Sequence, residues 1–225
     1  MTLHLTDGDR TRIAAAVTAA EAQTSGEIVT ILADSSDSYE DVALLWSAFV
    51  ALLALAVLAL APGFYLPLVD RVMGWWSHEW QPREVLTLAL IVATVKFTAM
   101  WALQLWQPLR LALVPGPVRH ARVRARAVTA FRVGTERRTT GADGVVIYLS
   151  RAERRAEIVA DSAIAREVAP EAWGEAMAAM LAELRAGRPA DGLIAAIARV
   201  GAVLAQHFPP LPGHVNELPD RLIEV

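Results

Sequence analysis

The chain has 225 residues, of which 55% are hydrophobic and 20% are charged, a composition too apolar for an intrinsically disordered protein. Its formal net charge of −3 argues against a general nucleic-acid binder, so we expect no nucleic acid among its partners. The chain has no cysteine, which excludes disulfides, iron–sulfur clusters and a cysteine nucleophile.

The first segment predicts a helix followed by a buried strand. Thr6 and Asp9 have the spacing of a capping box, and apolar residues from Ile13 onward follow a helical period. Residues Glu27 to Ala33 are apolar on both faces, which is typical of a strand that is covered on both sides. A segment this short cannot supply both covering layers, so we expect the rest of the domain further along the chain.

Two long apolar runs follow, at residues 42–61 and 85–105, and Lys96 is the only charged residue in them. At about 1.5 Å per residue, each run is long enough to cross a hydrocarbon core of about 30 Å. Two buried core helices are the alternative. We predict a transmembrane hairpin over residues 42–109, with an outer loop at residues 63–84.

The distribution of basic residues predicts the orientation of this hairpin. The loop between the runs holds Arg71 and Arg83, whereas five arginines lie within about 20 residues after the second run and none lies as close before the first. The positive side is expected in the cytoplasm, and two spans return the N-terminus to the same side. Tryptophans of the outer loop suit the lipid headgroup level: Trp75, Trp76 and Trp80.

A basic amphipathic helix is predicted after the second run. Apolar residues at Val118, Ala121, Ala125 and Val128 fall on one helical face, which we expect to pack on the sheet. Arginines on the remaining surface are expected to bind anionic lipid headgroups. These arginines are Arg119, Arg122, Arg124 and Arg126.

The last part of the chain predicts the missing layers. Strands at 144–149 and 156–160 flank a polar turn and form a hairpin, and three helices follow between Ser162 and Pro209. The expected fold is therefore α/β, a small mixed β-sheet flanked by helices on both faces with an inserted two-helix transmembrane hairpin. Residues 1–41 and 110–225 would be the two parts of this one domain.

Three stretches resemble proteins of the TPM domain family. The start of that family's first strand resembles Thr24-Ser25-Gly26-Glu27-Ile28-Val29, and its central hairpin is similar to residues 144–161. The closing segment of the family's bacterial integral-membrane branch resembles His207-Phe208-Pro209 together with residues 216–220.

The resemblance covers residues 5–34 and 117–220 and implies a small mixed sheet with helices on both faces. Some relatives are acid phosphatases, some bind divalent cations, and others are accessory proteins of membrane complexes. Many hold the domain outside the cytoplasm behind a signal peptide, whereas this chain begins with a polar, patterned segment and carries its apolar runs inside the domain. We expect a multi-pass protein of the bacterial inner membrane with both termini in the cytoplasm.

Acidic residues at strand ends are the candidate metal ligands. Glu27 begins the first strand, Asp143 precedes the second, and Asp161 follows the third. Ligands bind at strand ends in α/β sheets, and carboxylates are the ligands that Mg²⁺ and Ca²⁺ prefer. Structural roles are the alternative, since Asp161 can also cap the helix that follows it. No other cofactor is expected, and no motif assigns a catalytic residue.

Lys96 is the only lysine of the chain and lies in the middle of the second apolar run. A charge at that depth costs roughly 2.5–3.5 kcal/mol on insertion scales, which marks the residue as functional or partner-facing. We expect it to extend toward the membrane surface, to be held neutral among helices, or to meet an acidic group of a membrane protein or a second copy of the chain. The sequence thus favours a membrane-anchored interaction or accessory module, with a metal-dependent phosphatase as the alternative.

Overall fold

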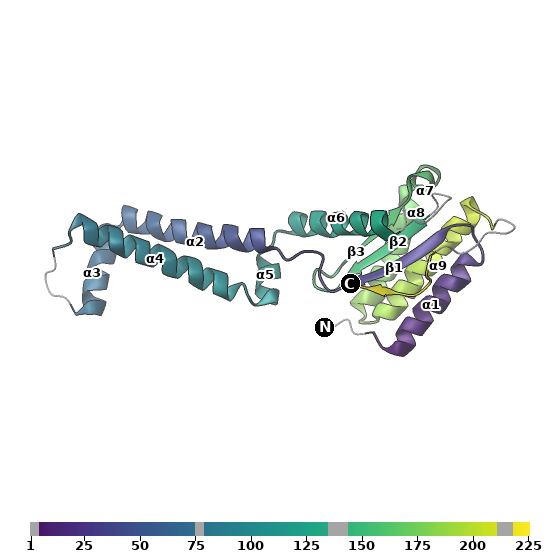
Figure 1. Cartoon of the computed structure of the whole chain (residues 1–225), viewed down its shortest axis with the longest axis horizontal. Coiled ribbons are helices and arrows are strands. Elements are labelled where there is room, and N and C mark those ends of the chain that lie inside the picture. Colours follow the sequence, from purple (N-terminus) through teal and green to yellow (C-terminus); the bar gives the residue numbers. More distant parts are fainter. Residues whose placement is uncertain (1–4, 75–78, 135–143, 211–217) are drawn as a thin grey trace. The chain divides into compact units, whose positions relative to one another are not determined.

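The computed structural model of the chain describes residues 5–74, 79–134, 144–210 and 218–225. The chain divides into two compact units. The first, which we call the sheet unit, consists of residues 1–37 and 116–225, and the second, the hairpin unit, consists of residues 38–115. Figure 1 shows the elements of both units.

The sheet unit is built on a mixed sheet of four strands in the order β3-β2-β1-β4. Strand β1 is parallel to both of its neighbours, and β2 is antiparallel to β3. The strands are β1 (Glu27–Ala33), β2 (Gly144–Ser150), β3 (Arg155–Ala160) and β4 (Ile223–Glu224). The helices are α1 (Asp7–Glu21), α6 (Gly116–Gly134), α7 (Ser162–Glu167), α8 (Pro170–Arg185) and α9 (Pro189–His207). The prediction of an α/β fold with a small mixed sheet is confirmed.

Both faces of the sheet are covered, as the apolar pattern of β1 predicts. All seven residues of β1 are buried. On one face, Ile28 and Leu32 belong to the core that α1, α8 and α9 complete, while on the other face Val29 and Ile31 pack with residues of α6. Helices from the two sides of the sheet are visible in Figure 1. The central strand and α1 therefore come from the N-terminal part of the chain, and the other covering helices come from the C-terminal part.

The face that α6 turns to the sheet differs from the predicted one. The buried residues are Val123, Ala127 and Phe131, whereas Ala121 and Ala125 are exposed. Both sets follow helical spacing, but the observed set includes a phenylalanine and so removes more apolar area from water. The prediction of the packing face was wrong because its window ended before Phe131.

Local signals place several element ends correctly. The predicted capping box is present, since Asp9 N–H donates to Thr6 Oγ1 at 3.2 Å and Thr6 N–H donates to Asp9 Oδ2 at 3.0 Å. Asp161 caps α7 by accepting a hydrogen bond from Ala163 N–H. The turn between β2 and β3 contains Arg154 with a φ of 51°, a backbone conformation that favours glycine.

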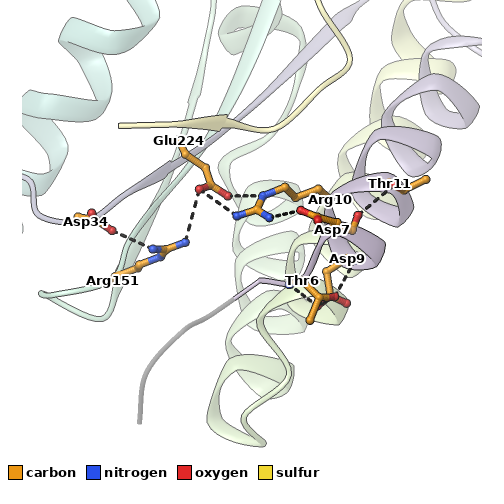
Figure 2. A network of polar contacts seen from close by, with 8 residues as sticks. All are labelled: Thr6, Asp7, Asp9, Arg10, Thr11, Asp34, Arg151 and Glu224. Atoms are coloured by element: carbon orange, nitrogen blue, oxygen red, sulfur yellow. Dashed lines mark hydrogen bonds and ion pairs between the residues drawn. The ribbon is translucent and has the colours of Figure 1, made fainter.

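The short strand β4 is held to the sheet unit by a polar network (Figure 2). Arg10 of α1 donates from Nε to Glu224 Oε1 at 2.9 Å and from Nη1 to Asp7 Oδ1 at 2.7 Å. Arg151 donates to Asp34 at 2.9 Å and lies 4.0 Å from Glu224. The network connects α1, β4 and the ends of β1 and β2, so it joins the first and last segments of the chain.

The hairpin unit contains four helices among its described residues: α2 (Glu40–Leu60), α3 (Pro62–Met73), α4 (Pro82–Leu103) and α5 (Gln107–Leu113). Gln104, which follows α4, is buried and donates to Ala43 O of α2 at 3.0 Å and to Ser47 Oγ at 3.3 Å. This buried amide joins the two long helices by polar contacts. The outer loop was predicted as a short interfacial segment, and much of it forms α3, which begins with a proline at its first turn.

Three helices in the described ranges are long and apolar enough to cross a membrane: α2, α4 and α9. The third of these belongs to the core of the sheet unit, where Leu193, Ile197 and Leu204 are fully buried. Its apolar character is therefore explained by packing on the sheet. The apolar surfaces of α2 and α4 have no such explanation within their unit.

Candidate functional site

Two acidic residues lie on one face of the sheet with a glycine between them. Glu27 pairs with Gly144 in the register of β1 and β2, and Asp161 N–H donates to Gly144 O at 2.9 Å. Side chains alternate between the faces of a strand, and both Val29 and Val159 pack on the face that α6 covers. Glu27 lies two residues before Val29, and Asp161 lies two residues after Val159, so both acids are on that same face. We call this arrangement of Glu27, Gly144 and Asp161 the carboxylate edge.

The carboxylate edge lies at the amino ends of β1 and β2, because β3 runs antiparallel and brings Asp161 to the same side. Ligands of open α/β sheets bind more commonly beyond the carboxyl ends of the strands. In this sheet those ends carry Asp34, Arg151 and Glu224, which are bonded to one another and to α1 (Figure 2). The sequence therefore placed its candidate ligands at a strand end, but at the less usual one.

Burial perturbs the protonation of a carboxylate beside Glu27. Glu27 is 2% exposed, and Glu21 at the end of α1 accepts a hydrogen bond from Ile28 N–H at 2.7 Å. Burial raises the pKa of Glu21 to about 8, the Ile28 N–H opposes this increase, and the charges of Glu27 and Asp220 add to it. Asp220 also shares a hydrogen bond with Glu21 and accepts one from Thr18 Oγ1. At neutral pH a proton is therefore held between acidic side chains.

Replacing Glu21 by glutamine is expected to weaken the pH dependence of stability. The pKa of Glu21 is about 8 in the folded chain against an ordinary value of 4.5. The folded state therefore binds the proton more tightly, and its stabilisation is complete below about pH 4.5 and is lost as the pH rises through about 8. We expect the wild-type melting temperature to fall by several degrees between about pH 6 and about pH 9, and that of Glu21→Gln to fall less.

The matched control is Glu171→Gln, which removes an exposed carboxylate in the first turn of α8. Its melting temperature should follow the wild-type pH profile. Identical pH profiles for wild type and Glu21→Gln would contradict the prediction.

The predicted metal ligands are only partly brought together. Glu27 and Asp161 share the carboxylate edge, and Asp143 lies outside the described residues. Asp161 also has the capping role that was the alternative, since it accepts hydrogen bonds from Ser162 Oγ at 3.1 Å and from Ala163 N–H at 3.4 Å. Within the described ranges, no group of three His, Cys, Asp or Glu residues is arranged to hold a metal ion. The carboxylate donors suit Mg²⁺ or Ca²⁺, but two of them make up only part of a coordination shell.

Two of the four arginines predicted to bind headgroups pair with acids of the sheet unit. Arg122 lies 3.0 Å from Asp37 at the end of the N-terminal segment, and Arg124 lies 3.5 Å from Glu157 of β3. Arg119, in the first turn of α6, instead lines a cavity beside β3. Headgroup binding stays a prediction for the whole set: Arg119, Arg122, Arg124 and Arg126.

Two of the three tryptophans predicted at the headgroup level, Trp75 and Trp76, lie outside the described residues. The Trp80 indole N–H donates to Asp70 Oδ2 at 3.3 Å, so this tryptophan is fixed to α3. Lys96 is exposed on α4, and it makes no ion pair with any residue that the structure describes. Among the described residues of the hairpin unit, no acidic side chain neutralises the charge of Lys96.

Sequence reasoning missed the perturbed Glu21. An acid in the last turn of a helix, close in sequence to Glu27, was a signal that could have been noticed. The contribution of Asp220 could not have been found in the same way, because it lies about 200 residues away in the sequence and reaches Glu21 only through the fold.

The fold is similar to that of a solved protein. The NMR structure of the BA42 protein from the psychrophilic bacterium Bizionia argentinensis aligns with a TM-score of 0.56 over 98% of this chain and 95% of that chain, at 18% sequence identity. At that identity the likeness concerns the fold alone. A comparison with curated proteins finds no match. Residues 117–203 match the profile of the family described as the TPM domain, a stretch that runs from the start of α6 into α9. Residues 117–203 of the chain are therefore similar to the TPM domain.

Proposed function

We propose that the chain is a membrane-anchored TPM-like domain that acts as an interaction or accessory module at the cytoplasmic face of the bacterial inner membrane. The observation that carries the proposal is the apolar surface of α2 and α4. In the hydrophobic stretch of α4 no residue is buried, and Leu90 is 68% exposed, while Leu45 and Leu52 on α2 are 70% and 65% exposed.

A soluble protein does not keep such helices in water. Contiguous exposed apolar patches beyond a few hundred Å² mark interaction or membrane surfaces. The helices have 21 and 22 residues, which corresponds to a length of about 30 Å and matches the hydrocarbon core of a bilayer. The buried Gln104 supports the same interpretation, because polar contacts between helices are a common feature of packing inside membranes.

Single cysteines will test the proposed topology, because the natural chain has none to remove. Three exposed positions are suitable: Gln23→Cys and Arg199→Cys in the sheet unit, and Phe64→Cys in α3. A membrane-impermeant maleimide should label Phe64→Cys in intact spheroplasts and should label the other two only after lysis. The physical reason is that two spans bring both parts of the sheet unit to the positive, cytoplasmic side.

Labelling of Gln23→Cys and Arg199→Cys on opposite sides, or of both in intact spheroplasts, would refute this topology. Recovery of the chain in the soluble fraction without detergent would refute the membrane anchor itself. Phe64→Cys that stays unlabelled in intact spheroplasts but reacts after lysis would also count against two complete spans.

Lys96 supports a partner inside the membrane. We expect Lys96→Leu to weaken association with a second copy or with another membrane protein by at least tenfold, because an acidic group would lose its counter-charge in a medium of low dielectric. The strength of association will be measured by chemical crosslinking and by the mass of the complex in mild detergent. The control Thr94→Val removes a hydroxyl that bonds only Leu90 O of its own helix among the described groups. Unchanged assembly in Lys96→Leu would remove the support for a partner.

A second candidate function is a divalent-metal-dependent phosphatase, and the carboxylate edge is the observation that favours it. Glu27 and Asp161 lie on one face with Gly144 between them in the register, and Gly144 has no side chain. A bound divalent cation would supply charge stabilisation for the phosphoryl group. The role of the two residues would be to hold that cation.

The phosphatase hypothesis is tested with p-nitrophenyl phosphate and Mg²⁺, Mn²⁺ or Ca²⁺. Hydrolysis should disappear in Glu27→Gln and in Asp161→Asn, while Glu171→Gln keeps it. Asparagine is as good a helix cap as aspartate, so Asp161→Asn removes the charge and keeps the cap of α7. Absence of hydrolysis, together with a melting temperature that no divalent cation changes, would reject this function and leave the accessory module.

A further inference from the structure

A cavity of about 710 Å³ lies in the sheet unit beside the edge strand β3. Three elements enclose it: the first turns of α6, the turn between β2 and β3 with the start of β3, and the second half of α8. A volume of this size is within the range of small-molecule sites in proteins. The cavity is separate from the carboxylate edge, because Arg155 begins β3 whereas Asp161 follows its other end.

Part of the lining of the cavity is apolar. Met177, Leu181 and Leu184 contribute from one face of α8, and Leu149 and Ala156 contribute from the sheet. The α8 residues are only partly buried, although their neighbours Ala176 and Met180 on the same helix are completely buried in the core. The apolar face of α8 therefore extends beyond the core and lines the cavity.

The lining of the cavity is also strongly basic. Four arginines line it: Arg119, Arg154, Arg155 and Arg185. In the part of the chain that the structure describes, the side chains of these four make no ion pair and no hydrogen bond. Among them, Arg119 Nε is buried without an acceptor. Buried guanidinium donors that lack acceptors are costly, and several like charges around one space repel one another.

The two acids that also line the cavity are bonded elsewhere. Glu157 lies 3.5 Å from Arg124 and 3.3 Å from the His120 imidazole. Glu153 accepts hydrogen bonds from Ser36 N–H at 3.0 Å and from the Ser150 hydroxyl. The cavity therefore has an excess of positive charge that its own acids do not neutralise.

We propose that this cavity binds an organic anion with an apolar body, a phosphate or carboxylate group attached to a hydrocarbon chain. The arginines would hold the anionic group, since a guanidinium presents a planar set of donors that fits phosphate and carboxylate oxygens. The leucines and Met177 of α8 would cover the hydrocarbon part. This site is independent of the membrane topology and of the carboxylate edge, so it does not rest on the function proposed above.

The shared chemistry has two sources, a soluble metabolite or a lipid, and two probes separate them. Hexyl phosphate represents the soluble class, and dihexanoyl phosphatidic acid represents the lipid class. Isothermal titration calorimetry of the full chain in phosphatidylcholine nanodiscs, with empty nanodiscs as the blank, should show one saturable site. Tighter binding of the diacyl probe identifies a lipid, and tighter binding of the single-chain probe identifies a soluble ligand. Inorganic phosphate should bind at least tenfold more weakly than the better probe.

Variants test which residues form the site. Arg119→Gln and Arg185→Gln are each expected to weaken binding of the better probe at least tenfold, while Arg199→Gln, an exposed arginine of α9 outside the cavity, leaves it unchanged. Leu184→Asn should weaken the better probe and leave inorganic phosphate unaffected. Unchanged melting temperatures will show that each variant is folded, and Arg185 is exposed enough that its replacement should not disturb the core. Absence of saturable binding by both probes, or equal binding by Arg185→Gln and Arg199→Gln, would overturn the proposal.

Discussion

A chain in which a flexible linker replaces residues 38–115 is expected to be soluble without detergent and to fold as the sheet unit. The reason is that residues 1–37 and 116–225 together contain the whole sheet with both of its cores. The replacement removes the apolar surfaces of α2 and α4, whose contact with water would otherwise require lipid or detergent.

The two ends that the linker must join lie close together. Asp37 ends the N-terminal segment and lies 3.0 Å from Arg122, about two turns into α6. A Gly/Ser linker of about 12 residues has an r.m.s. span of roughly 20 Å, which is enough to connect Asp37 to the first turn of α6. The measurements are elution on a sizing column without detergent, and a cooperative thermal transition followed by circular dichroism.

The control is a chain that lacks both residues 1–37 and the hairpin unit. Without β1, the sheet loses its central strand and β2 exposes an unpaired edge, so we expect this control to aggregate. If the control folded as well as the linker variant, the two sequence segments would not form one cooperative domain. Aggregation of the linker variant, at conditions where the full chain in nanodiscs melts cooperatively, would contradict the prediction directly.

Elements with strong local patterns could be predicted from the sequence. The run Glu27–Ala33 is apolar on both faces, and the strand has those bounds with every residue buried. The capping box of α1, the hairpin of β2 and β3, and the cap at Asp161 depend on residues within a few positions of one another. Short-range hydrogen bonds and side-chain alternation decide these features, so the pattern alone contains the information.

Features that depend on distant contacts could not be predicted in the same way. Two sets of residues on α6 have helical spacing, and only the position of the sheet selects Val123, Ala127 and Phe131. Strand β4 consists of two residues, and its pairing with β1 and its ion pair with Arg10 place it in the sheet. A segment this short has no period of its own to detect.

The candidate site shows the same division. Glu27 and Asp161 can be selected from the sequence because each lies at the end of a predicted strand. Their position on one face, with Gly144 between them, follows from the register of three strands, and a shift by one residue would place one of them on the opposite face. The basic cavity beside β3 requires α6, β3 and α8 together, so no single segment of the sequence indicates it.

Replacing Gly201 by alanine is expected to destabilise the sheet unit strongly, although the change adds only one methyl group. A Cβ atom at this position of α9 would lie 2.7 Å from Ala20 Cβ and 3.4 Å from Ala20 Cα of α1. Neither Ala20 atom can rotate away, because both are held by the backbone of α1. The helices α1 and α9 would therefore have to separate, which would disturb their packing against Ile28. We expect Gly201→Ala to lower the free energy of unfolding by about 2 kcal/mol, although alanine is the better helix former.

The same substitution at Gly174 provides the matched control, because a Cβ there meets no atom within 4 Å. Gly174 lies on the exposed side of α8, so Gly174→Ala should stabilise the chain by up to about 1 kcal/mol through helix propensity alone. Opposite signs at two helical glycines would show that packing decides the effect at Gly201. Thermal or urea unfolding of the full chain in nanodiscs, or of the linker variant, measures both values.

A double variant identifies the clash. Ala20→Gly removes the methyl group that a new side chain at position 201 would meet, so the pair Ala20→Gly and Gly201→Ala should be more stable than the sum of the single effects predicts. We expect a coupling of about 1–2 kcal/mol, because each single variant changes one side of a contact that the double variant exchanges. Strict additivity would mean that α1 and α9 adjust independently, and the close approach of the two helices would then not limit the stability of the sheet unit.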